Sequence, residues 1–174
     1  MKNVIYFSIF LLVALAPMTA LTEPALPKGI IKLDGRAAPA LVLKDMDGET
    51  FDIEKQAGKW LVIHFWASWC GPCRREMPTI NEIYKQFDEN KLRFVLINTA
   101  ESEDIVFNFI GIAAPDMIPL MDKDGAVTER WQPRGLPASF FVDPKGRLQY
   151  LALGGRDWRK TEYLKFLHGL IKSL

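Results

Sequence analysis

The sequence predicts an α/β domain, a three-layer sandwich with a mixed central sheet and an extra N-terminal β-hairpin. Two nearly continuous apolar segments, residues 59–67 and 91–100, are typical of strands that are covered on both faces. The segment between them has helical spacing, and a strand, a helix and a strand in this order form a parallel pair with a right-handed crossover. Residues 138–153 add two apolar runs around an Asp-Pro-Lys-Gly turn, which indicates an antiparallel hairpin in the same sheet.

The composition fits one globular domain and argues against a nucleic-acid partner. Of the 174 residues, 49% are hydrophobic, and 22 basic residues nearly balance 21 acidic ones. The sequence has no basic stripe of the kind that binds nucleic acid and no acidic tail of the kind that stays disordered. Eleven phenylalanines and five tryptophans indicate a packed, aromatic-rich interior.

The first residues of the chain differ from the rest. A lysine precedes an apolar run at residues 4–16, which together are typical of an export signal. We expect residues 1–20 to be a signal peptide or an N-terminal membrane anchor, since the run is near the lower length limit for crossing a bilayer. A buried helix is the alternative. Residues 21–34, which contain prolines and a glycine, are expected to be a linker, and residues 35–174 to be the domain.

The first half of the domain predicts a hairpin, two strands and a helix. Residues 38–53 are expected to form two short strands around a turn at residues 45–48. After the strand at 59–67, a helix should begin at or near Cys70, because Pro72 suits a first helical turn, where its missing N–H costs nothing. The helix and the residues just after it carry apolar side chains at helical spacing, namely Met77, Ile80, Ile83, Tyr84 and Phe87.

The second half continues with helices and strands. A short helix at 103–111 should end at Gly111, and a short strand with a turn follows within 117–125. Residues 126–131 are predicted to form a helical turn, and the chain closes with a helix at 157–174. Its predicted inward residues are Trp158, Leu164, Leu167, Leu170 and Ile171.

Cys70 and Cys73 are the only cysteines, and their spacing leaves three interpretations. A structural staple would close a loop of only four residues, which by chain entropy stabilises a protein by only about 2 kcal/mol. A zinc site normally needs four ligands, and the only histidines, His64 and His168, are far apart in the sequence. The third interpretation is a redox centre, which depends on the context of the pair.

Two longer segments supply that context. Residues 65–73, FWASWCGPC, and residues 134–148, RGLPASFFVDPKGRL, resemble the thioredoxin fold. Residues 36–160 as a whole resemble its TlpA/ResA-like branch, including the extra hairpin. The resemblance implies an exported thiol-disulfide oxidoreductase of the bacterial periplasm or the outer face of the cytoplasmic membrane, soluble after cleavage or tethered by residues 4–20.

The resemblance also implies a set of partners. These are protein disulfide clients, such as those of cytochrome c maturation or copper-site assembly, and a membrane electron donor that reduces the enzyme again. Beyond the cysteine pair, it implies no cofactor and no metal. Contact with the membrane would involve only the N-terminal segment.

The resemblance assigns roles to the residues of the redox centre. Cys70, at the positive end of a helix, is expected to attack, and Cys73 to resolve the mixed disulfide by forming a Cys70–Cys73 redox disulfide. Pro137 is expected to be cis and to face the cysteines, so that the Leu136 backbone can pair with a client segment. An ordinary strand-edge proline is the alternative. The Gly-Pro dipeptide between the cysteines matches thioredoxins, whose potential of about −270 mV favours a reductant.

Further side chains are candidates for supporting roles. Glu76, one helical turn beyond Cys73, matches an acid that tunes cysteine protonation in the TlpA/ResA-like branch, and a solvent-facing glutamate is the alternative. Trp69 is expected to contribute to an apolar rim for partners, or else to pack in the core. Arg74 and Arg75 would add positive potential around the thiolate, or else be merely solvated.

His64 is a departure from the resembled proteins. Thioredoxins have an acid at this place, and the TlpA-like branch often has an uncharged amide. Strand alternation puts His64 on one face with Val62 and Trp66. Burial should lower the pKa of His64, and a neutral imidazole could accept the proton of Cys73. A core histidine bonded to a backbone carbonyl is the alternative.

Two other functions stay open. The first is a disulfide oxidant or isomerase, which uses the same chemistry at a higher potential. The second is a copper-delivery protein that binds Cu(I) through Cys70 and Cys73, since thiolates are soft ligands. Met77 is close in sequence and could be a further ligand, although Pro137 would crowd the sulfurs.

Overall fold

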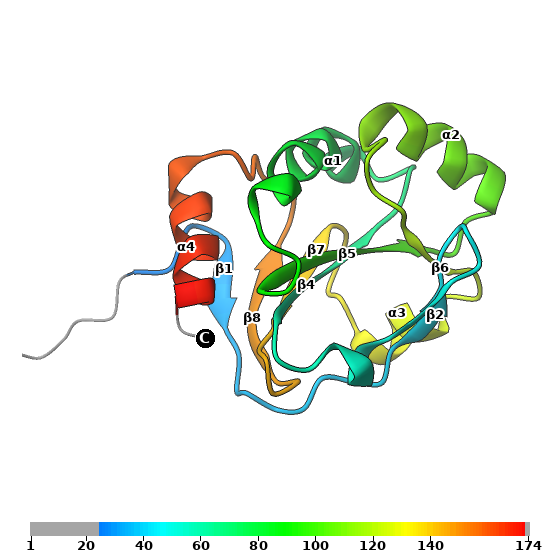
Figure 1. Cartoon of the computed structure of the whole chain (residues 1–174). Coiled ribbons are helices and arrows are strands. Elements are labelled where there is room, and N and C mark those ends of the chain that lie inside the picture. Colours follow the sequence, from blue (N-terminus) through cyan, green and yellow to red (C-terminus); the bar gives the residue numbers. More distant parts are fainter. Residues whose placement is uncertain (1–24, 173–174) are drawn as a thin grey trace, which may run out of the picture.

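The structure, a computed structural model, describes residues 25–172 (Figure 1). The expected signal peptide or anchor at residues 1–20 and the beginning of the expected linker lie outside these residues. Across residues 25–172, no helix is both long enough and apolar enough to cross a bilayer.

A six-stranded mixed sheet forms the middle layer, with the strand order β1-β8-β7-β4-β5-β6. Its strands are β1 (Ile30–Lys32), β4 (Trp60–Trp66), β5 (Leu92–Thr99), β6 (Leu120–Asp122), β7 (Ala138–Val142) and β8 (Leu148–Leu153). β4, β5 and β6 are parallel to one another. β7 is antiparallel to β4, β8 to β7, and β1 to β8. The mixed sheet and its antiparallel hairpin are therefore confirmed.

Helices and a second small sheet form the outer layers (Figure 1). One face of the central sheet is covered by α1 (Gly71–Ile83), α2 (Glu103–Ala113) and α4 (Thr161–Lys172). The other face is covered by α3 (Ala126–Trp131) and by the hairpin of β2 (Val42–Lys44) and β3 (Thr50–Asp52). Two short 3-10 helices, η1 (Ile53–Gln56) and η2 (Tyr84–Gln86), follow β3 and α1. The extra N-terminal hairpin is thus confirmed.

The central strand β4 separates two apolar cores. All seven of its residues are buried. Val62 and Trp66 belong to the core beneath α1, α2 and α4, whereas Leu61, Ile63 and Phe65 belong to the core on the α3 side. This is the alternation that the sequence predicts, and it follows from the two-residue period of a strand.

The boundary between linker and domain needs a correction. Residues 30–32, inside the predicted linker at 21–34, form the edge strand β1 and pair with residues 150–152 of β8. Ile30 is buried, so this short strand adds an apolar side chain to the core. Three residues are too few to give an alternation pattern, and the nearby prolines and glycine favour a linker, so the sequence did not predict this strand.

Two helix boundaries also differ from the predicted ones. α2 continues two residues past Gly111, because a glycine inside a helix costs only about 1 kcal/mol and does not by itself end it. α4 begins at Thr161 rather than at residue 157. Trp158 is nevertheless fully buried, as predicted, from the segment that precedes the helix.

Candidate active site

The two cysteines lie where β4 leads into α1. Cys70 is the residue before the helix, and its sulfur accepts a hydrogen bond from the backbone N–H of Cys73 at 3.2 Å. The structure joins the two side chains in a disulfide, with their Cα atoms 5.2 Å apart. The first N–H groups of a helix have no partner inside it, so this position stabilises a thiolate after reduction.

Both cysteines are buried, but Cys70 keeps slightly more exposed surface than Cys73. Cys70 is 5% exposed and Cys73 is 0% exposed. The preceding residue, Trp69, is 69% exposed, so the alternative that it packs in the core is wrong. Trp66 is fully buried. A partner that approaches the disulfide therefore meets Trp69 and the Cys70 side of the pair.

Glu76 lies in the interior of the protein. Its side chain is 1% exposed, so the alternative of a solvent-facing glutamate is wrong. The indole N–H of Trp158 donates a hydrogen bond to Oε1, and Nε of Arg156 lies 3.9 Å from the same oxygen. Burial raises the pKa of Glu76 to about 8, although the Arg156 charge and the Trp158 hydrogen bond act in the opposite direction. The carboxyl is therefore mostly protonated at pH 7.

The Arg156 side chain is fixed by its surroundings. Its guanidinium donates hydrogen bonds to the backbone carbonyls of Leu153 at 2.9 Å and Gly154 at 3.0 Å. It also lies over the rings of Trp158 and Tyr163, 5.2 and 5.3 Å from their centroids. Carbonyl dipoles and aromatic faces both stabilise a buried cation. One permanent positive charge is thereby placed next to Glu76.

His64 is buried in the middle of β4. Its Nδ1 lies 2.9 Å from the hydroxyl oxygen of Ser139 on the neighbouring strand β7. Burial, together with the Arg156 charge, lowers the pKa of His64 to about 3, in the predicted direction. Its partner is a hydroxyl rather than the backbone carbonyl of the alternative interpretation. Nε2 has no hydrogen-bond partner among the described residues and could accept a proton.

The loop that leads into β7 contains a cis peptide bond between Leu136 and Pro137, as predicted. The carbonyl of Pro137 accepts a hydrogen bond from the backbone N–H of Gly154 at 3.0 Å. The backbone N–H and C=O of Leu136 make no hydrogen bond to any of the residues 25–172. Its side chain is half-buried and contacts both cores.

A second polar network supports the turn before Cys70. Both the backbone N–H and the hydroxyl of Ser68 donate hydrogen bonds to the carboxylate of Glu101, which also accepts from the Asn98 side chain. Arg74 donates to the Ser68 carbonyl at 3.1 Å and lies over the ring of Phe109. Arg74 is thus not merely solvated but ties the first turn of α1 to the turn before it.

The sequence analysis did not predict that Arg156 and Trp158 contact Glu76 at the site. They follow β8 in the segment GGRDW, which has no periodic pattern. The available signal was the pair of glycines. A Cβ on Gly155 would lie 3.0 Å from both the Cβ and the carbonyl oxygen of Pro72, so the backbone here passes directly against the cysteine loop.

The comparisons agree with this geometry. The family model described as Redoxin matches residues 33–167. The thiol-disulfide oxidoreductase ResA of Bacillus subtilis is 30% identical over 121 residues, which cover 70% of this chain and 68% of that protein. ResA of Oceanobacillus iheyensis is 28% identical over 159 residues, covering 89% and 83% of the two chains.

Solved structures support the fold. A putative thiol:disulfide interchange protein DsbE from Chlorobium tepidum superposes with a TM-score of 0.71 at 23% identity, covering 79% of this chain and 96% of that one. StoA from Bacillus subtilis gives a TM-score of 0.60 at 24% identity, with coverages of 68% and 90%. From this fold, the family match and the cysteine pair at the start of α1, we conclude that the chain belongs to the Redoxin family, as a thiol-disulfide oxidoreductase of its TlpA/ResA-like branch.

Proposed function

We propose that this protein is exported and reduces specific disulfides of envelope proteins through Cys70 and Cys73. The observation that carries the proposal is the disulfide at the start of α1, in which Cys70 keeps a small exposed surface (5%) and Cys73 keeps none. This asymmetry suits a pair in which the outer cysteine attacks a client and the inner one completes the exchange.

The exchange would run in two steps. The Cys70 thiolate attacks one sulfur of a client disulfide, so that a mixed disulfide forms and the other client sulfur leaves as a thiolate. The Cys73 thiolate then attacks Cys70 Sγ, which forms the intramolecular disulfide and releases the second client sulfur. Two electrons pass to the client, and two protons complete its thiols. A membrane electron donor would then reduce the enzyme again.

His64 and Glu76 are proposed to handle the proton of Cys73. His64 is neutral at pH 7, and its Nε2 has no partner among the described residues, so it could take up the Cys73 proton transiently, directly or through a water, although its pKa of about 3 makes it a weak base. Glu76 stands three residues after Cys73 and holds a proton at pH 7. The buried region around Cys73 would therefore contain one potential proton acceptor, His64, and one potential proton donor, Glu76.

The client is proposed to bind along the loop of Leu136 and Pro137. The unpaired backbone groups of Leu136 could form strand-like hydrogen bonds with an extended client segment. The exposed ring of Trp69 would supply apolar contact next to Cys70.

A trapping experiment tests this function. In Cys73→Ala the second step is blocked, so mixed disulfides between Cys70 and client proteins should accumulate in the cell envelope. The matched control is the double variant Cys70→Ala/Cys73→Ala, which should trap nothing. The proposal is wrong if the single variant traps no more protein than the double variant.

The direction of transfer is tested by the redox potential of the pair. A value near −270 mV or below supports a reductant, whereas a value near −120 mV would make the protein an oxidant or isomerase. The Gly-Pro dipeptide favours the first outcome. For the copper-delivery alternative, the side chain of Met77 is fully buried in the core, which argues against its use as a third ligand.

Export is tested by the mass and location of the protein in the cell. We propose that the N-terminal segment directs the chain to the periplasm or to the outer face of the cytoplasmic membrane. Mass spectrometry of the purified protein distinguishes loss of a signal peptide from a retained anchor. Finding the full-length chain in the cytoplasm would refute the proposal.

A further inference from the structure

A cavity with a positively charged lining adjoins the disulfide. It is open to solvent and has a volume of about 340 Å³, between α1 and the segment that joins β8 to α4. This volume lies at the lower end of the range of ligand cavities, roughly 300–1,000 Å³. The charged and titratable residues of its lining are Arg75, Glu76, Arg156, Asp157, Arg159 and Lys160.

The cavity lies close to the redox centre. Pro72 stands between the two cysteines and lines the cavity, and Gly155 packs directly against it on the opposite wall. An extended polypeptide advances roughly 3.3 Å per residue. A segment joined to Cys70 by a mixed disulfide could therefore reach the cavity within a few residues of its own cysteine.

The positive charge of the lining is only partly balanced. Arg159 forms ion pairs with Asp157 at 2.8 Å and with Glu82 at 3.1 Å, so it is already neutralised. Arg75 and Lys160 are exposed and form no ion pair with any of the residues 25–172. Lys160 is attracted to Asp157 at longer range, so Arg75 is the less compensated of the two charges among the described residues.

The floor of the cavity has unpartnered polar groups. The side chain of Arg156 is 5% exposed, and its Nε–H has no hydrogen-bond acceptor within the described residues. Oε2 of the 1% exposed Glu76 makes no well-formed hydrogen bond there, although the Arg156 backbone N–H is close enough to the carboxyl to act against the rise of the pKa of Glu76. Burial keeps the Glu76 carboxyl mostly protonated at pH 7, so it adds a potential donor instead of a negative charge. Buried donors without acceptors, beside unpaired cations, favour an anionic occupant that accepts hydrogen bonds.

We propose that this cavity binds an acidic side chain of the client protein, a glutamate or aspartate a few residues from the client cysteine that is attacked. The proposal rests on the proposed reductase function and adds a specificity to it. Arg75 and Lys160 at the rim would attract the carboxylate, and Nε–H of Arg156 and the protonated Glu76 carboxyl would donate hydrogen bonds to it. A polypeptide occupant is favoured over a free anion because the disulfide next to the cavity tethers it there.

The test compares two synthetic peptides, each with one internal disulfide. They differ only in carrying glutamate or glutamine two and three residues from each cysteine. The reduced enzyme should reduce the acidic peptide about three- to tenfold faster at low ionic strength, the effect expected for two partly exposed charge pairs. The ratio of the two rates cancels any change that affects both peptides equally, and it should shrink as salt is added.

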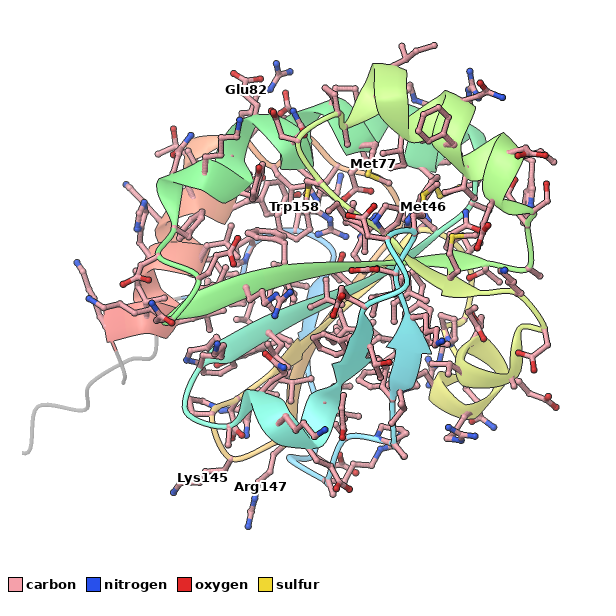
Figure 2. All side chains as sticks on the ribbon, turned by 45° about the vertical axis from the view of Figure 1, so that its right-hand side comes forward. Met46, Met77, Glu82, Lys145, Arg147 and Trp158 are labelled. Atoms are coloured by element: carbon pink, nitrogen blue, oxygen red, sulfur yellow. A yellow bond between two sulfur atoms is a disulfide. The ribbon has the colours of Figure 1, made fainter. Side chains whose placement is uncertain are left out.

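Two double variants locate the effect. Arg75→Gln/Lys160→Gln should bring the ratio of rates close to one. Lys145→Gln/Arg147→Gln removes the same charge from an exposed loop at the opposite edge of the molecule from Glu82, the ion-pair partner of Arg159, and should keep the ratio (Figure 2). If both variants lose the preference equally, it arises from net charge and the cavity proposal is wrong.

The remaining outcomes separate this inference from the proposed function. If the parent protein reduces both peptides at equal rates, the cavity proposal fails while the reductase function stands. If it reduces neither peptide, nor any protein disulfide, the function itself fails. A ratio near one, together with binding to phosphatidylglycerol vesicles that is lost in Arg75→Gln/Lys160→Gln, would assign the cavity to a membrane surface and overturn the client proposal.

Discussion

Glu76→Gln preserves the shape of a buried side chain and removes its titration, so it should change how the stability of the oxidised protein depends on pH. Burial raises the pKa of this carboxyl from 4.5 to about 8. Between these pH values the folded protein retains a proton that the unfolded chain releases. The free energy of unfolding therefore falls as the pH rises, by up to about 1.4 kcal/mol per pH unit.

The magnitude depends on two residues that act with opposite signs. From pH 4.5 to 7, Glu76 lowers the free energy of unfolding by roughly 3 kcal/mol. Glutamine does not titrate, so the variant avoids this loss. His64 has a pKa of about 3 when folded and 6.5 when unfolded, so its contribution is present above pH 6.5 and is lost as the pH falls toward 3. In the parent, the contributions of Glu76 and His64 to the free energy of unfolding change with pH in opposite directions and cancel between pH 4.5 and 6.5. From pH 6.5 to 8 only the Glu76 contribution changes, and it lowers the free energy of unfolding. In Glu76→Gln, stability should rise up to pH 6.5 and then stay level.

Urea unfolding of the oxidised protein at pH 5, 6, 7 and 8 measures this difference. The free energy of unfolding of Glu76→Gln, relative to the parent, should increase by roughly 3–4 kcal/mol from pH 5 to pH 8. Glu89→Gln, at an exposed acid without an ion pair among the described residues, is the matched control and should follow the parent. If the difference between Glu76→Gln and the parent is constant across this range, Glu76 is not a protonated buried acid and the reasoning fails.

Three further predictions concern the site. Iodoacetamide at mildly acidic pH should modify Cys70 of the reduced protein much faster than its partner, as mapped by mass spectrometry; equal or reversed rates would contradict its role as the attacking sulfur. His64→Leu should slow release of a mixed disulfide at pH 7, measured by stopped flow, with Cys70 alkylation nearly unchanged; release as fast as in the parent would reduce His64 to packing. Gly155→Ala should lower the free energy of unfolding by about 1–3 kcal/mol, because the new Cβ would lie 3.0 Å from Pro72 atoms, whereas Gly135→Ala has open space; equal stabilities would contradict the close approach.

The parts of the fold that the sequence predicted are those with a strong local pattern. β4 and β5 are continuous apolar runs, and the apolar residues of α1 recur at helical spacing, so burial on both faces and the crossover follow from them. β1 was missed because its three residues owe their conformation to pairing with β8, more than a hundred positions later. No local pattern carries that information.

The same distinction holds for the site. The cysteine pair and the cis peptide bond before Pro137 were predicted, since each lies within a short motif that the family resemblance covers. The burial of Glu76 was an open question, because an acid in the first turns of a helix is usually solvated. What decides it is a contact with Arg156 and Trp158 from the other end of the domain.

Burial explains how one interior can hold an acid and a base that are both neutral at pH 7 beside the permanently charged Arg156. Burial disfavours charge on either group, so it raises the pKa of Glu76 and lowers that of His64. The guanidinium opposes the first shift and adds to the second, yet Glu76 keeps its proton. The only permanent charge among the three is therefore the one stabilised by carbonyls and aromatic rings. Environments that push two pKa values apart in this way assign an acid and a base. On this basis we propose Glu76 as the proton donor and His64 as the proton acceptor for Cys73.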